Sequence, residues 1–153
     1  MIKIISYTPA YAAAFKAINE EWITKYFKME DSDYKALDHP QEYILDRGGA
    51  ILVVLENNEV VGVCALIKMD HPEYDFELAK MGVRPHTQAK GLGYLLGQAI
   101  IEKAKELGAK TIYLETNTCL APAIKLYFKL GFTEVKGVAT PYDRCDFQME
   151  LKL

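Results

Sequence analysis

The chain has few cysteines, no long apolar run and no excess of positive charge, and each of these absences excludes a class of protein. Its three cysteines, Cys64, Cys119 and Cys145, are far apart and odd in number, so they predict neither a disulfide framework nor a zinc cluster. No stretch approaches the roughly 20 apolar residues that a membrane-spanning helix needs. The formal charge of −3 disfavours a nucleic-acid-binding protein, whose affinity depends on a basic surface.

A secretory signal is also missing, because the first residues lack a long apolar core and a small-residue cleavage site. A cytoplasmic location is therefore expected. The three histidines are not paired at helical spacing with one another, so no metal site is predicted. Half of the 153 residues are apolar and a quarter are charged, which is typical of one folded domain. We expect a single domain over residues 1–153, with neither a nucleic acid nor a membrane as partner.

Apolar periodicity predicts a mixed α+β chain, in which segments with strand patterns alternate with segments of helical period. The helix after residue 91 has the clearest pattern, since its apolar residues recur on one face and Gly108 follows as a C-terminal cap. Helices are predicted over residues 9–26, 92–107 and 122–130, with two short helices within 29–45. Strands are predicted over residues 2–7, 50–55, 60–69, 74–83, 111–116, 132–135 and 145–153.

A basic turn that contains glycines joins the strand at 74–83 to the following helix. Gly91 and Gly93 allow main-chain N–H groups to approach an anion closely, and the N-terminus of a helix carries roughly half a positive charge. Arg84 and Lys90 add full positive charges nearby. This combination favours the binding of a diphosphate.

Residues 88–93, Gln-Ala-Lys-Gly-Leu-Gly, match a pattern of the GNAT superfamily of N-acetyltransferases: the Gln/Arg-x-x-Gly-x-Gly/Ala loop that holds the pyrophosphate of acyl-CoA. Residues 77–83 and 123–132 resemble further motifs of that superfamily in the same order, so the resemblance covers roughly residues 50–135. It implies an α+β (mixed α/β) GNAT-like fold, a twisted mixed sheet with helices on both faces and splayed parallel central strands. It also implies transfer of an acetyl group from acetyl-CoA to a primary amine, by direct attack in a ternary complex.

The same resemblance assigns roles to individual residues. Tyr127, which ends the Ala-Ile-Lys-Leu-Tyr segment, would be the general acid for the leaving thiolate, and Glu77 the general base for the attacking amine. Main-chain groups of Met81 and Val83 would pair with the pantetheine arm, and one N–H would stabilise the oxyanion. Leu120 stands where the family usually has asparagine, so Asn117 is the expected substitute. The remaining acetyl-CoA contacts are assigned to Gly82, Gln88, Ala89, Lys90, Gly91, Leu92, Gly93, Tyr94 and Ala123.

The residues alone leave alternatives open. Tyr127 also fits an ordinary core position, and Glu77 a solvent-facing position on a strand. The spacing of Gly91, Gly93 and Gly97, with Glu115 at the end of the next strand, imitates a dinucleotide-binding fingerprint. An acyl-CoA-binding regulatory module without catalytic activity would have the same loop.

The acceptor is expected to be a small-molecule or peptide amine, and the resemblance suggests a homodimer as the assembly. In such folds the acceptor walls come from the first helices and the final loop. Acidic residues among them either attract a cationic amine or cap a helix in solvent. These wall residues are Trp22, Tyr26, Phe27, Glu30, Asp31, Asp33 and Tyr142.

Overall fold

The computed structural model describes residues 1–87 and 90–153. These residues form one seven-stranded sheet of order β1-β2-β3-β4-β5-β7-β6. Neighbouring strands are antiparallel except for the central pair, β4 and β5, which are parallel. The expected mixed sheet is therefore confirmed. Its strands are β1 (Ile2–Ser6), β2 (Ala50–Glu56), β3 (Glu59–Lys68), β4 (Phe76–Val83), β5 (Thr111–Thr116), β6 (Thr133–Val135) and β7 (Phe147–Lys152).

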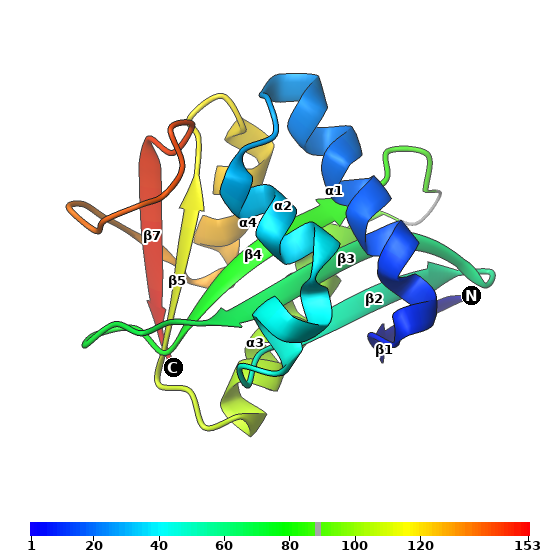
Figure 1. Ribbon diagram of the computed structural model, residues 1–153, viewed down its shortest axis with the longest axis horizontal. Helices are drawn as coiled ribbons and strands as arrows, with labels where there is room; N and C mark the ends of the chain where they lie inside the picture. Colours follow the sequence, from blue (N-terminus) through cyan, green and yellow to red (C-terminus); the bar gives the residue numbers. More distant parts are fainter. Residues whose placement is uncertain (88–89) are drawn as a thin grey trace.

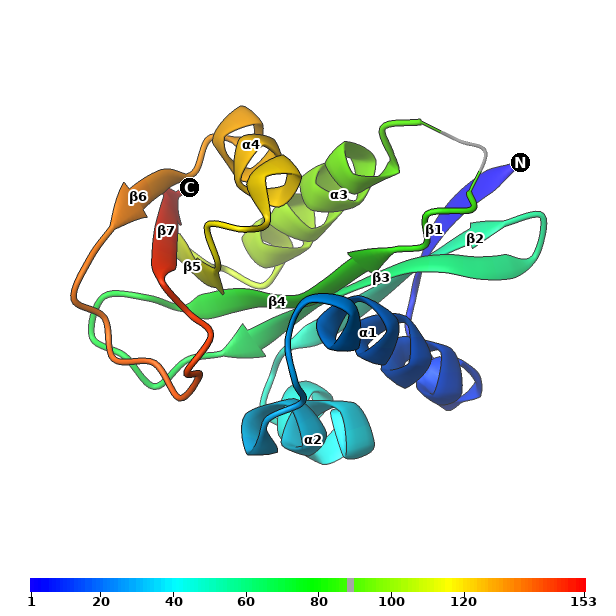
Figure 2. The same ribbon diagram turned by 90° about the horizontal axis from the view of Figure 1, so that it is seen from above.

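Helices cover both faces of the sheet, as the resemblance implied (Figures 1 and 2). One face carries α1 (Ala12–Tyr26) and α2 (Asp31–Asp38), and the other carries α3 (Leu92–Glu106) and α4 (Ala121–Leu130). A 3-10 turn (Pro9–Tyr11) precedes α1, and a π-helical turn (Gln41–Leu45) follows α2. The two short helices that were expected around Pro40 are thus present, on either side of it.

The sheet separates two apolar cores. Beneath α3, the side chains of Leu96 and Ile100 pack against Leu78 of β4 and Ile112 of β5. Beneath α1 and α2, a second set joins Phe15, Ile18, Ala36, Leu37, Val53 and Val63. Because β2 and β3 contribute to both cores, their sequences are nearly continuous apolar runs, whereas α1 and α3 need only one apolar stripe.

Glycine and asparagine end the elements where the sequence predicted. Asn57 and Asn58 turn the β2–β3 hairpin with φ values of 51° and 69°, the left-handed pair that a two-residue hairpin favours. Gly131 ends α4 with φ of 104°. These local signals determine where the chain reverses, and hence the strand order around the site.

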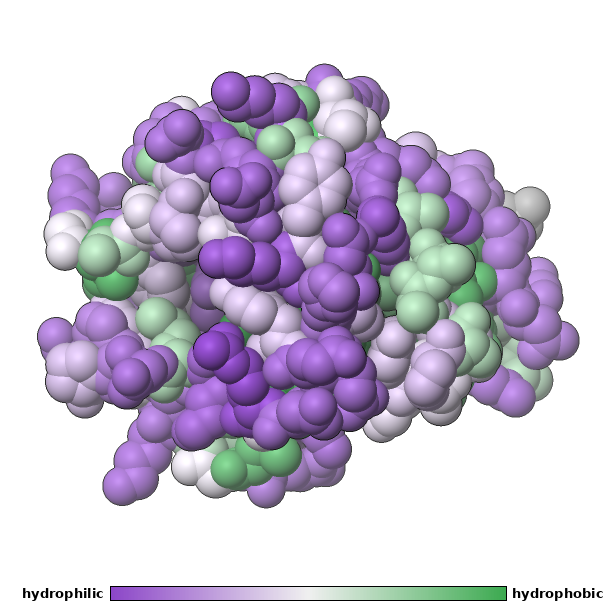
Figure 3. All heavy atoms as spheres, in the orientation of Figure 1, coloured by the Kyte–Doolittle hydropathy of each residue, from purple (hydrophilic) through white to green (hydrophobic). Residues whose placement is uncertain are grey.

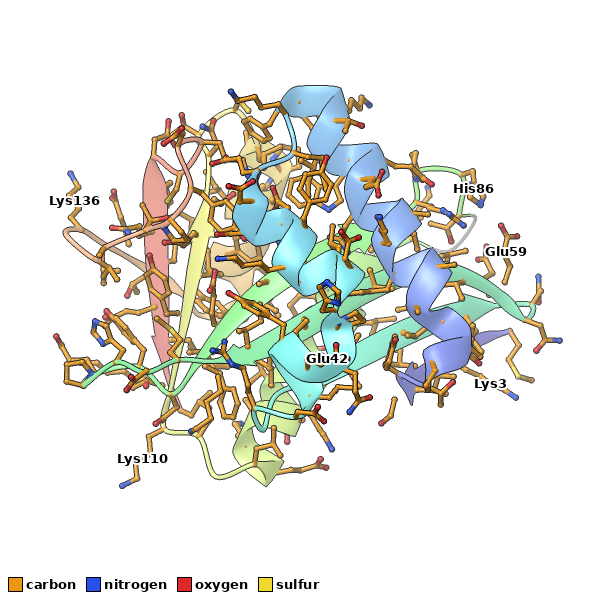
Figure 4. The ribbon with its side chains drawn as sticks, viewed as in Figure 1. Lys3, Glu42, Glu59, His86, Lys110 and Lys136 are labelled. Atoms are coloured by element: carbon orange, nitrogen blue, oxygen red, sulfur yellow. The ribbon has the colours of Figure 1, made fainter. Side chains whose placement is uncertain are left out.

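Hydrophilic side chains predominate on the face of the molecule seen in Figure 3, over α1 and α2. Lys3, Lys110 and Lys136 extend outward at its edges, and His86 lies beside Glu59, with Nε2 and Oε1 3.3 Å apart (Figure 4). Throughout the described part of the chain, no helix combines the length and apolarity that crossing a bilayer requires.

Candidate functional site

The two parallel strands at the centre of the sheet separate soon after they meet. Only Phe76 with Ile112 and Glu77 with Tyr113 are paired across β4 and β5. Beyond these pairs the strands diverge toward their carboxyl ends (Figure 1). The expected splay is confirmed, and it opens the sheet between its two faces at Glu77.

A β-bulge in β4 shapes one wall of this opening. Lys80 has φ of 53°, and neither Lys80 nor Met81 has a ladder partner on β3. The bulge turns Ala79 and Lys80 to the same side of the sheet, toward α1 and α2, and returns Met81 to the α3 side. A left-handed conformation outside glycine costs about 1–2 kcal/mol, so contacts of the Lys80 side chain must maintain it.

The opening leads into a cleft of about 230 Å³. It brings together six residues assigned from the sequence to catalysis or to acetyl-CoA, Glu77, Met81, Gly82, Asn117, Ala123 and Tyr127. Aromatic side chains from α1 and from the loop before β7 form its other side. The complete lining is Trp22, Tyr26, Phe27, Glu77, Leu78, Ala79, Lys80, Met81, Gly82, Glu115, Thr116, Asn117, Leu120, Ala123, Tyr127, Tyr142, Arg144 and Cys145.

Two carboxylates line the cleft, and their surroundings differ. Burial raises the pKa of Glu77 to about 8, with a further increase from the Glu115 carboxylate and an opposing effect of Lys80. Within the described residues no hydrogen bond engages the Glu77 carboxylate. Glu115 instead accepts a hydrogen bond of 2.7 Å from the Tyr113 hydroxyl, which in turn accepts one of 2.7 Å from Gln148. The Glu77 carboxyl is therefore free of hydrogen bonds to other described residues, whereas Glu115 is held in place by Tyr113.

Tyr127 reaches the cleft from α4. Its ring packs against the core beneath α3, edge-on to Phe132 with centroids 6.1 Å apart. Burial raises the pKa of its hydroxyl to about 12, so the group remains protonated at neutral pH and can donate a hydrogen bond. Tyr127 is thus both a core residue and a cleft residue.

The N-terminus of α3 lies beyond the end of β4. Gly91 is the N-cap with φ of 74°, is exposed, and has no atom near the position a β-carbon would take. Leu92 is buried in the core, a β-carbon on Gly93 would lie 3.1 Å from Leu126, and Lys129 stacks over the ring of Tyr94 at 4.3 Å. Because its side chain is buried, Leu92 can offer an anion only its main-chain groups.

Other residues assigned to this loop have different surroundings. Lys90 is exposed, whereas Arg84 pairs with Glu21 at 3.1 Å, so its charge is already balanced. Val83 ends β4 opposite Gly62. The buried Thr87 hydroxyl has no hydrogen-bond partner in the part of the chain that is described. Gln88 and Ala89 lie outside the described residues.

A family model for the acetyltransferase (GNAT) family matches residues 15–132. This chain belongs to the GNAT acetyltransferase family. It is therefore an N-acetyltransferase, and the dinucleotide-binding alternative was wrong. The chain is 34% identical over 131 residues to the uncharacterized N-acetyltransferase YjgM of Escherichia coli K12, covering 83% of this chain and 77% of that protein.

Solved structures agree with the GNAT fold. An acetyltransferase of the GNAT family from Staphylococcus aureus Mu50 superposes with a TM-score of 0.89 at 23% identity, covering 99% of both chains. The yncA protein of Salmonella typhimurium, solved with its cofactor acetyl-CoA, superposes with a TM-score of 0.77 at 23% identity, over 99% of this chain and 94% of that one.

Leu120 stands where the GNAT pattern usually has asparagine, and Asn117 lies three residues before it. Leu120 is the N-cap of α4 and lines the cleft. The Asn117 side chain donates a hydrogen bond of 2.7 Å to the carbonyl of Arg144 and accepts one of 2.8 Å from the Cys119 N–H. Asn117 thus joins the loop after β5 to the loop before β7 and also lines the cleft.

Among the acidic residues at the start of α2, Asp31 is exposed in the first turn and does not line the cleft, as the solvated-cap alternative expected, whereas Asp33 differs from both alternatives. Asp33 is fully buried, neither a solvated cap nor part of the cleft lining. It accepts a hydrogen bond of 2.9 Å from the Glu30 N–H and forms ion pairs with Lys80 and Arg144. Trp22, Tyr26, Phe27 and Tyr142 do line the cleft, as expected for acceptor walls.

Sequence reasoning missed Lys80, Arg144 and the role of Glu115 in the cleft. One available signal was a second charge, Lys80, three residues after Glu77 within an apolar strand. No group of three or more His, Cys, Asp or Glu side chains among residues 1–87 and 90–153 is arranged to hold a metal ion.

Proposed function

We propose that this GNAT enzyme transfers the acetyl group of acetyl-CoA to a primary amine by direct attack within a ternary complex. The supporting observation is that Glu77 of β4 and Tyr127 of α4 line one cleft where β4 and β5 separate. Glu77 would be the proton acceptor and Tyr127 the proton donor, and no covalent acetyl-enzyme would form.

The donor would lie between the N-terminus of α3 and Tyr127. The open backbone at Gly91 and the unpartnered Thr87 hydroxyl fit an anion at the start of α3. The set proposed for acetyl-CoA also includes Val83, Lys90, Leu92, Gly93, Tyr94 and Ala123, with Gln88 and Ala89 by the sequence pattern alone. Bound there, acetyl-CoA would direct its thioester toward the unpaired backbone of Lys80 and Met81.

The reaction needs three proton transfers, because two protons leave the nitrogen and one reaches the sulfur. An alkylammonium with a pKa near 10 must lose a proton before its nitrogen attacks, at a cost of about 4 kcal/mol at pH 7. Glu77 would accept that proton, and the free nitrogen would then form a bond to the thioester carbonyl carbon. A main-chain N–H at Met81 would stabilise the resulting oxyanion. The nitrogen, positively charged after the attack, would lose its second proton to solvent, and as the C–S bond breaks Tyr127 would donate a proton to the thiolate and regain one from solvent.

Calorimetric titration with acetyl-CoA, followed by thiol release over a panel of amines, tests the proposal. We expect binding, and thiol release only when an acceptor is present. Tyr127→Phe should lower kcat at least tenfold and leave CoA affinity unchanged, whereas Tyr34→Phe, an exposed position on α2, should leave both unchanged. Absence of binding at millimolar acetyl-CoA would reject the proposal, and binding without thiol release would support a regulatory module instead.

A further inference from the structure

Four charged side chains form a cluster beside the cleft, which we call the Asp33 cluster: Asp33, Lys80, Arg144 and Glu30. Arg144 donates two hydrogen bonds to Asp33, of 2.6 and 2.7 Å, and a third of 3.3 Å to Glu30. Lys80 Nζ lies 2.5 Å from the Asp33 carboxylate and donates a 3.0 Å hydrogen bond to the Tyr142 hydroxyl. Two cations are therefore matched by two carboxylates.

The cations of this cluster line the cleft, but their charge is not available to a ligand. The side chains of Lys80 and Arg144 are only 4% and 14% exposed, and that of Asp33 is 0% exposed. Asp33 holds the charged ends of both. A ligand in the cleft therefore contacts Lys80 and Arg144 side chains whose charges are already paired with Asp33.

The cleft carboxylates have no such partner. Glu77 forms no ion pair with any described residue, and the bond that Glu115 accepts comes from the uncharged Tyr113 hydroxyl. Around them stand the rings of Trp22, Tyr26, Phe27 and Tyr142. The charge available to an acceptor is thus that of the Glu115 carboxylate, joined by Glu77 once it is deprotonated, inside an aromatic and largely apolar wall.

We propose that the acceptor is a cationic amine with an apolar or aromatic substituent and no carboxylate next to its amino group, and that Asp33 determines this preference by neutralising Lys80 and Arg144. This inference rests on the proposed function. An ammonium group is attracted by the Glu115 carboxylate, and by Glu77 once it is deprotonated, and can stack on the Trp22 indole; Lys80 and Arg144 already lie over the rings of Tyr142 and Phe27. A carboxylate beside it would enter the cleft next to like charges, with both nearby cations already occupied, and would lose its hydration without compensation.

The test compares two acceptors that differ in one carboxylate, 2-phenylethylamine and L-phenylalanine. The measured quantity is the ratio of their kcat/KM values, because changes in the shared chemistry cancel in the ratio. The wild-type protein should favour 2-phenylethylamine by at least about tenfold. Both compounds are also titrated as ligands, so the charge preference is measured whether or not either is acetylated.

Variants of the cluster should move this ratio in opposite directions. Asp33→Asn leaves the cations in excess and should lower the ratio about tenfold, whereas Lys80→Met leaves Asp33 paired with Arg144 and should raise it. The double variant restores the charge balance and should return the ratio to within about threefold of wild type. Asp31→Asn removes a charge from the exposed side of the same helix and should have no effect. CoA affinity is measured in every variant and should be unchanged in Asp31→Asn.

A wild-type ratio near one, or a folded Asp33→Asn protein with the wild-type ratio, would overturn the inference. If circular dichroism shows that Asp33→Asn does not fold, Glu30→Gln removes one carboxylate from Arg144 while Asp33 stays in place, and an unchanged ratio in that variant would count equally against it. Failure of the proposed function would look different, since no amine would then release thiol in the wild-type protein, while the two titrations would still report the charge preference.

Discussion

Gly82 on β4 lies so close to Trp22 on α1 that a β-carbon on Gly82 would come within 2.8 Å of Trp22 Cδ1. Hydrogen bonds within α1 fix the indole. Its Nε1 donates a 3.0 Å hydrogen bond to Asn19, whose amide donates one of 2.9 Å to the carbonyl of Phe15. The absence of a side chain at Gly82 therefore determines how closely α1 approaches the cleft.

Gly82→Ala should displace Trp22 and widen the acceptor side of the cleft. We expect a loss of about 1–3 kcal/mol in the free energy of unfolding, as for other overpacked sites, together with a higher KM for the amine. Urea unfolding and steady-state kinetics measure the two effects. Gly62→Ala on β3, where the nearest atom is Val54 Cγ2 at 3.3 Å, should cost less and leave KM unchanged; equal effects in both variants would contradict the role of Trp22.

The pH dependence of turnover should report Glu77. Since burial, the Glu115 carboxylate and the opposing Lys80 charge set its pKa to about 8, most of the carboxyl is protonated at pH 7 and becomes a base as pH rises. The ratio of wild-type to Glu77→Gln kcat/KM should therefore increase from pH 6 to 8 and level off above about pH 9, and the titration of the amine cancels in this ratio. A ratio independent of pH would remove Glu77 as the base.

Acid should destabilise the protein through Asp33. Burial alone would raise the pKa of this carboxyl, but hydrogen bonds from Arg144 and the charge of Lys80 lower it to about 2, from an ordinary value of 3.8. The stabilisation is therefore fully present above the unfolded-state pKa and is lost as pH falls from about 4 to 2, by about 2 kcal/mol.

The free energy of unfolding in urea at pH 5 and at pH 2.5 measures this loss. Asp33→Asn should be less stable at pH 5 and should lose about 2 kcal/mol less than the wild type between the two pH values. Asp31→Asn should retain the wild-type difference. The same pH difference in Asp33→Asn would show that the ion pairs of Asp33 contribute nothing to acid stability.

The two glycines that flank α3 both have positive φ, so the effect of backbone strain on stability can be measured separately from an effect on CoA binding. Gly91 before the helix has φ of 74° and Gly108 after it has φ of 82°, and at either position an added β-carbon would lie in open space. Alanine at either position should cost about 1–2 kcal/mol of stability from backbone strain.

Only Gly91→Ala should also lower the affinity for CoA, by about tenfold, because only that glycine lies where the pyrophosphate is proposed to bind. Thermal melting with and without CoA measures both quantities in one experiment. Equal CoA affinity in the two variants would place the anion elsewhere.

Much of the architecture follows from local patterns. The apolar stripe of α3, the asparagine pair at residues 57–58 and Gly131 at the end of α4 are signals that act within a few residues, and the structure confirms each. The glycine-containing turn before α3 was recognisable for the same reason. Its assignment to CoA remains a prediction from the resemblance.

The spatial relation of Glu77 and Lys80 could not be predicted from such local patterns. In a regular strand, residues three apart point to opposite faces, so the sequence suggested no relation between these two charges. The bulge turns Lys80 to the side that Glu77 and Ala79 already face, and Lys80 then meets Asp33, 47 residues away in the chain. Arg144, 111 residues from Asp33, completes the cluster.

The helices and strands and their order along the chain can be read from the amino-acid sequence, because periodicity and turn chemistry depend on near neighbours. The acyl-CoA residues are predicted from the family resemblance. Which charges are neutralised and which face the cleft cannot be read in this way. The pKa and availability of Glu77, Lys80 and Arg144 depend on burial and on distant partners, and the packing of α2, β4 and the loop before β7 supplies both.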